Sequence, residues 1–176
     1  MNIKQIVEHD IDIQTSEKIT GLRNSCFPEH QCNRSYYKQL PHFRLLAFNG
    51  DLLIGHLGVD HRMMLFDKKP FAVFGVIDLC VREEYRGKGI GGELLKVLEN
   101  KAQLANIDSI LLLADDPRLY LQYGFKSMDV ECTWLRIDEH KNFGVGRERI
   151  ENEVMFKALS PLFEARGPID LLGYMY

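Results

Sequence analysis

The residues best suited to chemistry lie in a glycine-rich stretch between an apolar strand and a helix. Residues 81–92 read VREEYRGKGIGG, in which Arg86 is followed by four glycines within six residues. Because glycine has no side chain, backbone N–H groups in such a stretch can reach a large anion, and the start of a helix favours negative charge. Arg86 and Lys88 add positive charge, although Lys88 also fits a plain solvated surface position. The stretch therefore predicts a cradle for a diphosphate.

The same stretch also matches a dinucleotide-binding pattern. Gly87, Gly89 and Gly92 satisfy G-x-G-x-x-G, which normally joins the first strand of that fold to its first helix, with an acidic residue about 20 positions further on. Here two hairpin signals come before the glycines, at Asn49-Gly50 and at residues 67–70. Antiparallel strands before the turn disfavour the dinucleotide interpretation, which stays open together with that of a glycine-rich turn without a ligand.

Two motifs in a fixed order give the chain a family resemblance. Arg86, Gly89 and Gly91 fill the fixed positions of R/Q-x-x-G-x-G/A, and residues 119–125, LYLQYGF, are similar to L/F-Y-x-x-x-G-F. In both respects the chain resembles the GNAT superfamily of acyl-CoA-dependent N-acyltransferases. The resemblance covers residues 76–126, whereas neither motif places residues 1–40 or 140–176.

The resemblance implies acetyl-CoA as the cofactor. In the family the acyl-CoA enters a gap between two strands, which here end at Val81 and Leu113. The pantetheine arm then lies along the first of these strands, where a main-chain N–H can polarise the thioester carbonyl. The residues expected to bind the cofactor are Leu79, Cys80, Val81, Arg86, Gly87, Lys88, Gly89, Ile90, Gly91 and Gly92.

Acyl transfer to an amine needs an acid and a base. Tyr120 matches the family tyrosine that protonates the leaving thiolate, and a purely packed tyrosine is its alternative. Asp78 is the carboxylate nearest the thioester strand and is the candidate base, although the family often carries its base at the position of Ile77. Asp78 also fits a structural, hydrogen-bonded carboxylate. Asp115 and Asp116 are candidates for binding the acceptor, or for capping the helix that follows.

The expected acceptor is a primary amine of a small molecule or peptide. A weaker resemblance to aminoglycoside 2′-N-acetyltransferases rests on residues 53–56, on Asp115-Asp116 and on Arg166-Gly167, and it is incomplete because Ile77 stands where those enzymes carry an acid. Aminoglycoside acetylation is therefore an alternative, as is a non-catalytic acyl-CoA-binding module.

Composition sets the broad class. A chain of 176 residues with 45% hydrophobic and 27% charged residues fits one domain over residues 1–176. A net charge of −3 gives no nucleic-acid footprint. No apolar run reaches the ~20 residues that span a bilayer, and residues 1–20 are unlike a signal peptide, so a cytoplasmic location is expected. The four cysteines show no C-x-x-C spacing, so neither a metal site nor a disulfide framework is expected. The family resemblance allows a homodimer.

These residues need a mixed sheet to position them. Strands are expected at residues 2–7, 44–48, 52–64, 71–81, 110–113, 130–137 and 153–159, and helices from Ser16, over 36–40, from the glycines to 104 and around Tyr120. Residues 138–151 are expected to form a loop, and residues 161–176 receive no assignment. His56 and His61 are interpreted as half-buried strand residues. This order predicts an α/β fold of the GNAT type, with a mostly antiparallel, mixed sheet and helices on both faces.

Overall fold

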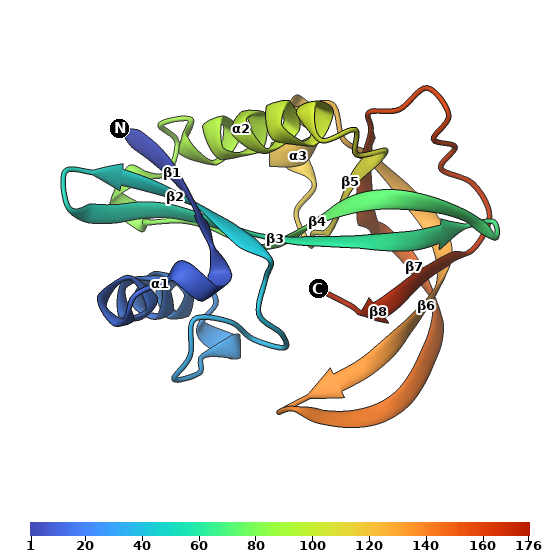
Figure 1. Cartoon of the computed structure of the whole chain (residues 1–176), viewed down its shortest axis with the longest axis horizontal. Helices are drawn as coiled ribbons and strands as arrows, with labels where there is room; N and C mark the ends of the chain where they lie inside the picture. Colours follow the sequence, from blue (N-terminus) through green and yellow to red (C-terminus); the bar gives the residue numbers. More distant parts are fainter. The chain divides into compact units, whose positions relative to one another are not determined.

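The computed structural model describes residues 1–176 (Figure 1). The chain consists of two compact units. Unit 1 consists of Met1–Asp60 and Ile77–Leu98, and unit 2 of His61–Val76 and Glu99–Tyr176. Strands β3 (Leu52–Phe66) and β4 (Lys69–Val81) and helix α2 (Ile90–Leu104) contribute residues to both units. None of the helices combines the length and the apolar content that crossing a membrane requires.

Unit 1 contains an antiparallel set of strands. Strand β1 (Asn2–Val7) pairs with β2 (Phe43–Asn49), and β2 pairs with β3. The turn between β2 and β3 contains Gly50 in the left-handed region, with a φ of 57°, as the Asn49-Gly50 signal predicted. An irregularity between Ala47 and Phe48 shifts the register, so Phe48 lies opposite Leu53. Successive residues of a strand point to opposite faces, so this pairing decides which side chains share a face.

Helices cover both faces of β2 and β3 within unit 1. Helix α1 (Ile13–Cys26) packs Ile19 and Leu22 against Leu46 and Leu53 on one face. On the other face, a Cβ atom on Gly55 would lie 2.9 Å from Ile90 Cγ2, because the start of α2 packs there. Figure 1 shows α1 and the start of α2 on the two sides of these strands. The predicted fold class, a mixed sheet with helices on both faces, is confirmed.

Unit 2 supplies the parallel pairing. Strand β5 (Ser109–Leu113) runs parallel to β4, and the last pair of this ladder is Gly75 with Leu111. Strand β5 also pairs antiparallel with β7 (Lys141–Ala158), which forms a hairpin with β6 (Lys126–Asp138). Strand β8 (Ile169–Tyr174) runs parallel to β6 and antiparallel to the end of β3. Three aromatic rings, of Phe66, Phe71 and Phe163, pack edge to face in the core of this unit.

Two helix predictions in unit 1 were wrong in detail. Helix α1 begins at Ile13, before the predicted Ser16, because the Asp12 carboxylate caps it by accepting the Thr15 N–H at 2.7 Å. Residues 36–40 form no helix. Arginine side chains bind backbone carbonyls in and just before this segment instead: Arg34 donates to Tyr37 O, and Arg44 donates to Ser35 O. The short helices of this part are the 3₁₀ turns Glu8–Asp10, Pro28–His30 and Glu83–Tyr85.

The predicted loop at residues 138–151 was also wrong. Most of it belongs to β7, because Glu139 and His140, with φ of 43° and 59°, make a tight turn and return the chain beside β6. Most side chains in this part of β7 are exposed, so the sequence lacks the apolar alternation that marks a half-buried strand. The final residues, which had no assignment, contain β8.

Candidate functional site

The glycine stretch forms an open loop at the start of α2, in unit 1. Gly87 and Gly89 have φ of 73° and 80°, and no atom lies within 4 Å of a Cβ built on either residue. The Glu93 N–H donates to Gly89 O at 3.0 Å, which makes it an early intrahelical bond of α2. The N–H groups of Ile90, Gly91 and Gly92 precede it, so the helix itself gives them no partner. Amides without an intrahelical partner, open space and the positive end of a helix suit a phosphate group.

Two exposed cations flank this loop. Arg86 Nε donates to Val81 O at 3.1 Å, which ties the arginine to the end of β4. Lys88 Nζ lies 4.9 Å from the centroid of the Tyr85 ring. Together with the amides of α2, the charge on these side chains fits the two negative groups of a diphosphate.

The predicted thioester strand lies in the same unit. Cys80 is buried, whereas Leu79 and Val81 are partly exposed. Unit 1 therefore brings together all the residues predicted to bind the cofactor, namely Leu79, Cys80, Val81, Arg86, Gly87, Lys88, Gly89, Ile90, Gly91 and Gly92. Asp78, just before them, has a φ of 49° near the end of β4. A left-handed residue in a strand breaks the regular alternation and redirects the peptide group that follows it.

The Asp78 carboxylate has a buried arginine as its partner. Arg23 Nε on α1 donates to Asp78 Oδ2 at 2.7 Å, and the two side chains are 1% and 16% exposed. Arg23 also donates to His30 O at 2.8 Å, on the segment after α1. The ion pair thus joins α1 to β4. Asp78 has the structural partner that its alternative interpretation anticipated, and its predicted role as a base stays a prediction.

A second buried network, which the sequence interpretation missed, lies beside this pair. Arg44 is 1% exposed and donates to both carboxylate oxygens of Glu8, at 2.6 and 2.7 Å, and to Ser35 O at 2.8 Å. Arg44 Nη1 also lies 3.0 Å from His56 Nε2, and His56 Nδ1 lies 2.9 Å from Asp78 O. The expectation of a half-buried His56 was wrong, because this side chain is fully enclosed. The only sequence signal was the presence of Arg44 and His56 between apolar neighbours in their strands.

The surroundings of His56 favour its neutral form. Burial lowers the pKa of His56 to about 3, and the positive charge of Arg44 acts in the same direction. His56 therefore carries no charge at neutral pH.

Cys26 lies beside the arginine of the glycine loop. Arg86 Nη2 is 3.6 Å from Cys26 Sγ. A hydrogen bond from the Cys80 thiol lowers the pKa of Cys26 to about 6, with further contributions from Arg86 and Ser25 that outweigh partial burial. The same interaction and burial raise the pKa of Cys80. The lowered pKa of Cys26 favours its thiolate, which is the reactive form of cysteine.

Alkylation of the folded protein should consequently begin at Cys26. We expect its rate of reaction with iodoacetamide to be half-maximal near pH 6, whereas burial raises the pKa of Cys132 to about 11 and protects it. Peptide mass spectrometry after timed labelling between pH 5 and 9 measures both rates. The Cys26→Ser variant serves as the control that removes the early label. Labelling of Cys26 that rises only near pH 9 would contradict the low pKa.

Tyr120 lies in unit 2, on the short helix α3 (Arg118–Gln122). Its backbone O accepts the N–H groups of Tyr123, at 2.9 Å, and Phe125, at 3.2 Å. Gly124 has a φ of 81°, which allows the chain to leave the helix and bring Phe125 back, 5.9 Å from the Tyr120 ring in an edge-to-face contact. The spacing of the second motif is thereby explained: the glycine makes the turn that packs the phenylalanine on the tyrosine.

The two acidic candidates precede this helix. Asp115 and Asp116 are both exposed, and Pro117 is the N-cap residue of α3. Asp116 accepts the Arg118 N–H at 3.0 Å and pairs with the Arg118 guanidinium, which lowers the pKa of Asp116 to about 2. Asp116 thus contributes to the start of α3, close to the capping alternative, and the part of either residue in acceptor binding stays a prediction.

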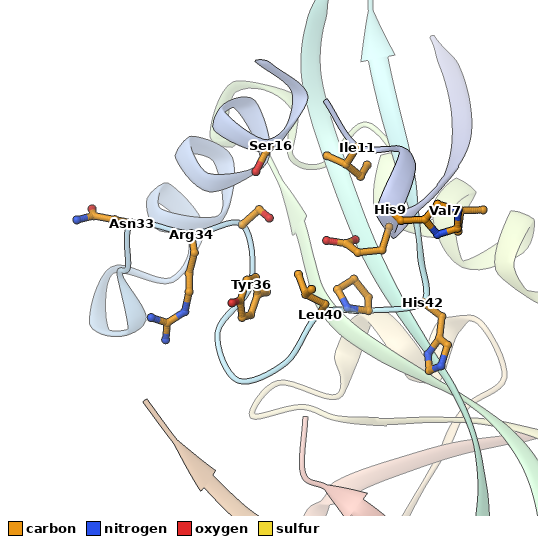
Figure 2. A pocket seen from close by; sticks show the side chains of 12 residues that line it. Val7, His9, Ile11, Ser16, Asn33, Arg34, Tyr36, Leu40 and His42 are labelled. Carbon is orange, nitrogen blue, oxygen red and sulfur yellow. The ribbon is translucent and has the colours of Figure 1, made fainter. Parts of the chain in front are cut away.

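Unit 1 also contains a cavity of about 770 Å³ (Figure 2). Its wall consists of Val7, Glu8, His9, Ile11, Ser16, Asn33, Arg34, Ser35, Tyr36, Leu40, Pro41 and His42. Figure 2 shows Tyr36 and Leu40 of the segment after α1 on one side and Ile11 and His9 on the other. Glu8 and Ser35, both bonded to Arg44, belong to this wall. None of the predicted site residues lines the cavity.

The chain matches a known protein family over its central part. Residues 43–127 match the family model described as acetyltransferase (GNAT) domain. This stretch contains both motifs, and the resemblance inferred from them is confirmed.

Solved structures share the fold at low identity. A GNAT family N-acetyltransferase from Escherichia coli in complex with CoA is 18% identical, with a TM-score of 0.64, over 97% of this chain and 89% of that chain. A GNAT family acetyltransferase from Brucella melitensis in complex with acetyl-CoA is 16% identical, with a TM-score of 0.60, over 96% and 94%. An aminoglycoside 6′-N-acetyltransferase complexed with coenzyme A is 14% identical, with a TM-score of 0.63, over 93% and 100%. The chain also matches larger structures, of which it spans only 33% and 34%.

Proposed function

We propose that this chain, which carries the GNAT fold and a GNAT domain match over residues 43–127, is an acetyl-CoA-dependent N-acetyltransferase formed by one domain over residues 1–176. The observation that carries the proposal is the open loop of Gly87 and Gly89 before the first amides of α2, which have no intrahelical partner. Structures of the same fold that hold CoA or acetyl-CoA support it. The acceptor in this proposal is a primary amine of a small molecule or peptide.

Binding of the cofactor would rest on unit 1. The amides of Ile90, Gly91 and Gly92 donate to the diphosphate, and Arg86 balances part of its charge. The main chain of Leu79 to Val81 lies along the pantetheine arm, as an added strand would. When bound, acetyl-CoA supplies an acetyl thioester whose carbonyl carbon accepts the amine. A backbone N–H of this strand then stabilises the negative charge on the carbonyl oxygen.

The proton transfers are assigned to two side chains. An alkyl amine has a pKa of about 10.4 and must lose a proton before it can attack. Asp78 is the proposed base, through water, with Oδ1 as the receiving oxygen because Oδ2 is held by Arg23. Tyr120 is the proposed acid that donates a proton to the departing sulfur. Asp115 and Asp116 are proposed to attract the cationic acceptor before its deprotonation.

Two measurements test this function. Calorimetry with acetyl-CoA and with NAD should show binding of acetyl-CoA alone, whereas NAD binding would support the dinucleotide interpretation. Release of free CoA should then be followed against aminoglycosides, polyamines and peptide N-termini. Turnover with at least one amine is expected. Acetyl-CoA binding without turnover of any amine in the panel would favour the non-catalytic acyl-CoA-binding module.

Aminoglycosides are the second candidate acceptors. Aminoglycosides carry several ammonium groups, and the exposed carboxylates of Asp115 and Asp116 offer them complementary charge. An aminoglycoside 6′-N-acetyltransferase shares the fold. The amine panel tests this candidate, and mass spectrometry of the product locates the acetylated nitrogen, including the 2′ position that the sequence resemblance favours.

A cytoplasmic location and a homodimer stay predictions from the sequence.

A further inference from the structure

The hydrogen bonds of His56 define its tautomer. A guanidinium has only donors, so the Arg44 Nη1 contact of 3.0 Å makes His56 Nε2 an acceptor. The proton of the neutral imidazole therefore resides on Nδ1. His56 Nδ1 lies 2.9 Å from the backbone O of Asp78 and donates to it. Cys80 Sγ lies 3.7 Å from the same nitrogen, so Asp78 O, which is much closer, is the main acceptor of this proton. His56 is thus a neutral, fully buried donor to one carbonyl of β4.

That carbonyl belongs to the irregular part of β4. Asp78 has a φ of 49°, and its O is bound by a side chain of β3, the strand that contains His56. A trans peptide is planar, so its C=O and N–H groups point in opposite directions. The peptide group that contains Asp78 O also contains the N–H of Leu79. Fixing Asp78 O toward His56 therefore directs the Leu79 N–H to the opposite side.

We propose that His56 is a positioning residue, whose Nδ1–H holds Asp78 O and so directs the Leu79 N–H toward the thioester oxygen of the acyl donor. The inference rests on the proposed function and deepens it, because it names the amide that stabilises the charge on the carbonyl oxygen. An amide with that task must keep one direction throughout the reaction. A hydrogen-bond donor that is already in place stabilises the developing negative charge without a cost for reorientation. His56 acts on the reaction only through this peptide group.

The neighbours of His56 keep it in place. Arg44, the partner of Nε2, is itself held by both oxygens of Glu8 and by Ser35 O and Oγ. Asp78 is fixed a second time, through its side chain, by Arg23. The irregular peptide group of β4 is therefore bound from two sides, by a histidine at its carbonyl and by an arginine at the adjacent side chain. These contacts limit the rotation of the peptide group that carries the Leu79 N–H.

Two isosteric substitutions separate the two bonds of His56. The amide nitrogen of asparagine is as many bonds from Cβ as Nδ1, so His56→Asn keeps a donor for Asp78 O. The amide oxygen of glutamine is as many bonds from Cβ as Nε2, so His56→Gln keeps the acceptor for Arg44 and loses the donor. We expect kcat of His56→Gln to fall roughly 10- to 100-fold, with the Kd of acetyl-CoA within about 2-fold of wild type, and His56→Asn to keep kcat within about 3-fold.

A measurement without any acyl donor tests the geometry itself, and it stays informative where a variant does not fold. ¹⁵N NMR of wild-type protein should show His56 protonated at Nδ1 and unprotonated at Nε2, without titration between pH 5 and 8. A second measurement adds the acyl donor: acetyl-CoA should shift the Leu79 amide resonance in wild type and in His56→Asn, and shift it much less in His56→Gln.

The outcomes distinguish this inference from the proposed function. A proton on Nε2, an unchanged kcat in His56→Gln, or equal losses in both variants would overturn the positioning role. Wild-type protein that neither binds nor turns over acetyl-CoA would overturn the proposed function, while the tautomer could still be determined. The expected tautomer, together with rescue by asparagine alone, would support the role.

Discussion

The Gly89→Glu variant is expected to lose acetyl-CoA binding, with a Kd at least about 100-fold above that of wild type. Gly89 has a φ of 80°, a region that side-chain-bearing residues rarely adopt, and open space where its Cβ would lie. A glutamate there places a carboxylate in the volume that the diphosphate would occupy. Two like charges about 4 Å apart at a protein surface repel by about 4 kcal/mol, which exceeds the ~2.7 kcal/mol of a 100-fold change.

A matched variant separates this repulsion from strain in the backbone. Gly144, in β7, has the same φ of 80° and the same open space, yet belongs to no predicted site. Gly144→Glu should therefore show a similar loss of thermal stability and unchanged affinity for acetyl-CoA. Isothermal calorimetry on both folded variants makes the comparison. Affinity retained in Gly89→Glu would place the diphosphate elsewhere, and affinity lost in both variants would point to a global effect.

The parts of the fold that sequence predicted are those that depend on short-range patterns. Helix α2 ends at Leu104 as expected, because an apolar stripe of helical period follows the glycines. Strand β1 has the predicted bounds as well. The error at the start of α1 is of another kind, since Asp12 and Ser16 are both good caps and only the hydrogen bond to Thr15 decides between them.

The prediction of a loop at residues 138–151 failed for a physical reason that applies to exposed hairpins in general. The backbone of β7 is paired with β6 over most of its length, and the buried apolar residues Val154 and Met155 lie near its end, so residues 141–150 can form a strand with mostly exposed side chains. Residues 138–151 are polar and contain glycine, and pattern reasoning then indicates a loop. Pairing between distant residues, such as Val130 with Ile150, is invisible to a local window.

The candidate site also contains residues that the sequence could identify and residues that it could not. The residues of the glycine loop are contiguous in sequence, so their motif could be recognised and the structure gathers them at one helix start. The buried polar network could not be recognised, because its bonds join residues far apart in the chain: Arg23 to Asp78 over 55 positions and Arg44 to Glu8 over 36. A charged residue in an apolar strand signals that a partner exists, and only the fold identifies the partner.

The second large effect, a fall in kcat, is expected when the hydroxyl of Tyr120 is removed. The Tyr120→Phe variant should lower kcat about 100-fold, because a general acid typically contributes about 10²- to 10⁴-fold. The phenylalanine keeps the ring that packs on Phe125 at 5.9 Å, and the backbone O that accepts the Tyr123 and Phe125 N–H groups is unchanged. The Kd of acetyl-CoA should therefore stay within about 2-fold of its wild-type value. The measurement is steady-state CoA release with the best amine of the panel.

The neighbouring tyrosine provides the control that gives this result its meaning. Tyr123 closes the same helix, and its backbone O accepts Lys157 Nζ at 2.7 Å, a bond that Tyr123→Phe leaves intact. Full activity in Tyr123→Phe, beside the loss in Tyr120→Phe, would assign the effect to one hydroxyl rather than to a looser α3. An unchanged kcat in Tyr120→Phe would instead mean that the thiolate leaves without this proton. A drop in kcat with constant Kd would mean that the Tyr120 hydroxyl interacts with the reacting groups only in the transition state. An interaction that also binds acetyl-CoA in the ground state would raise Kd as well.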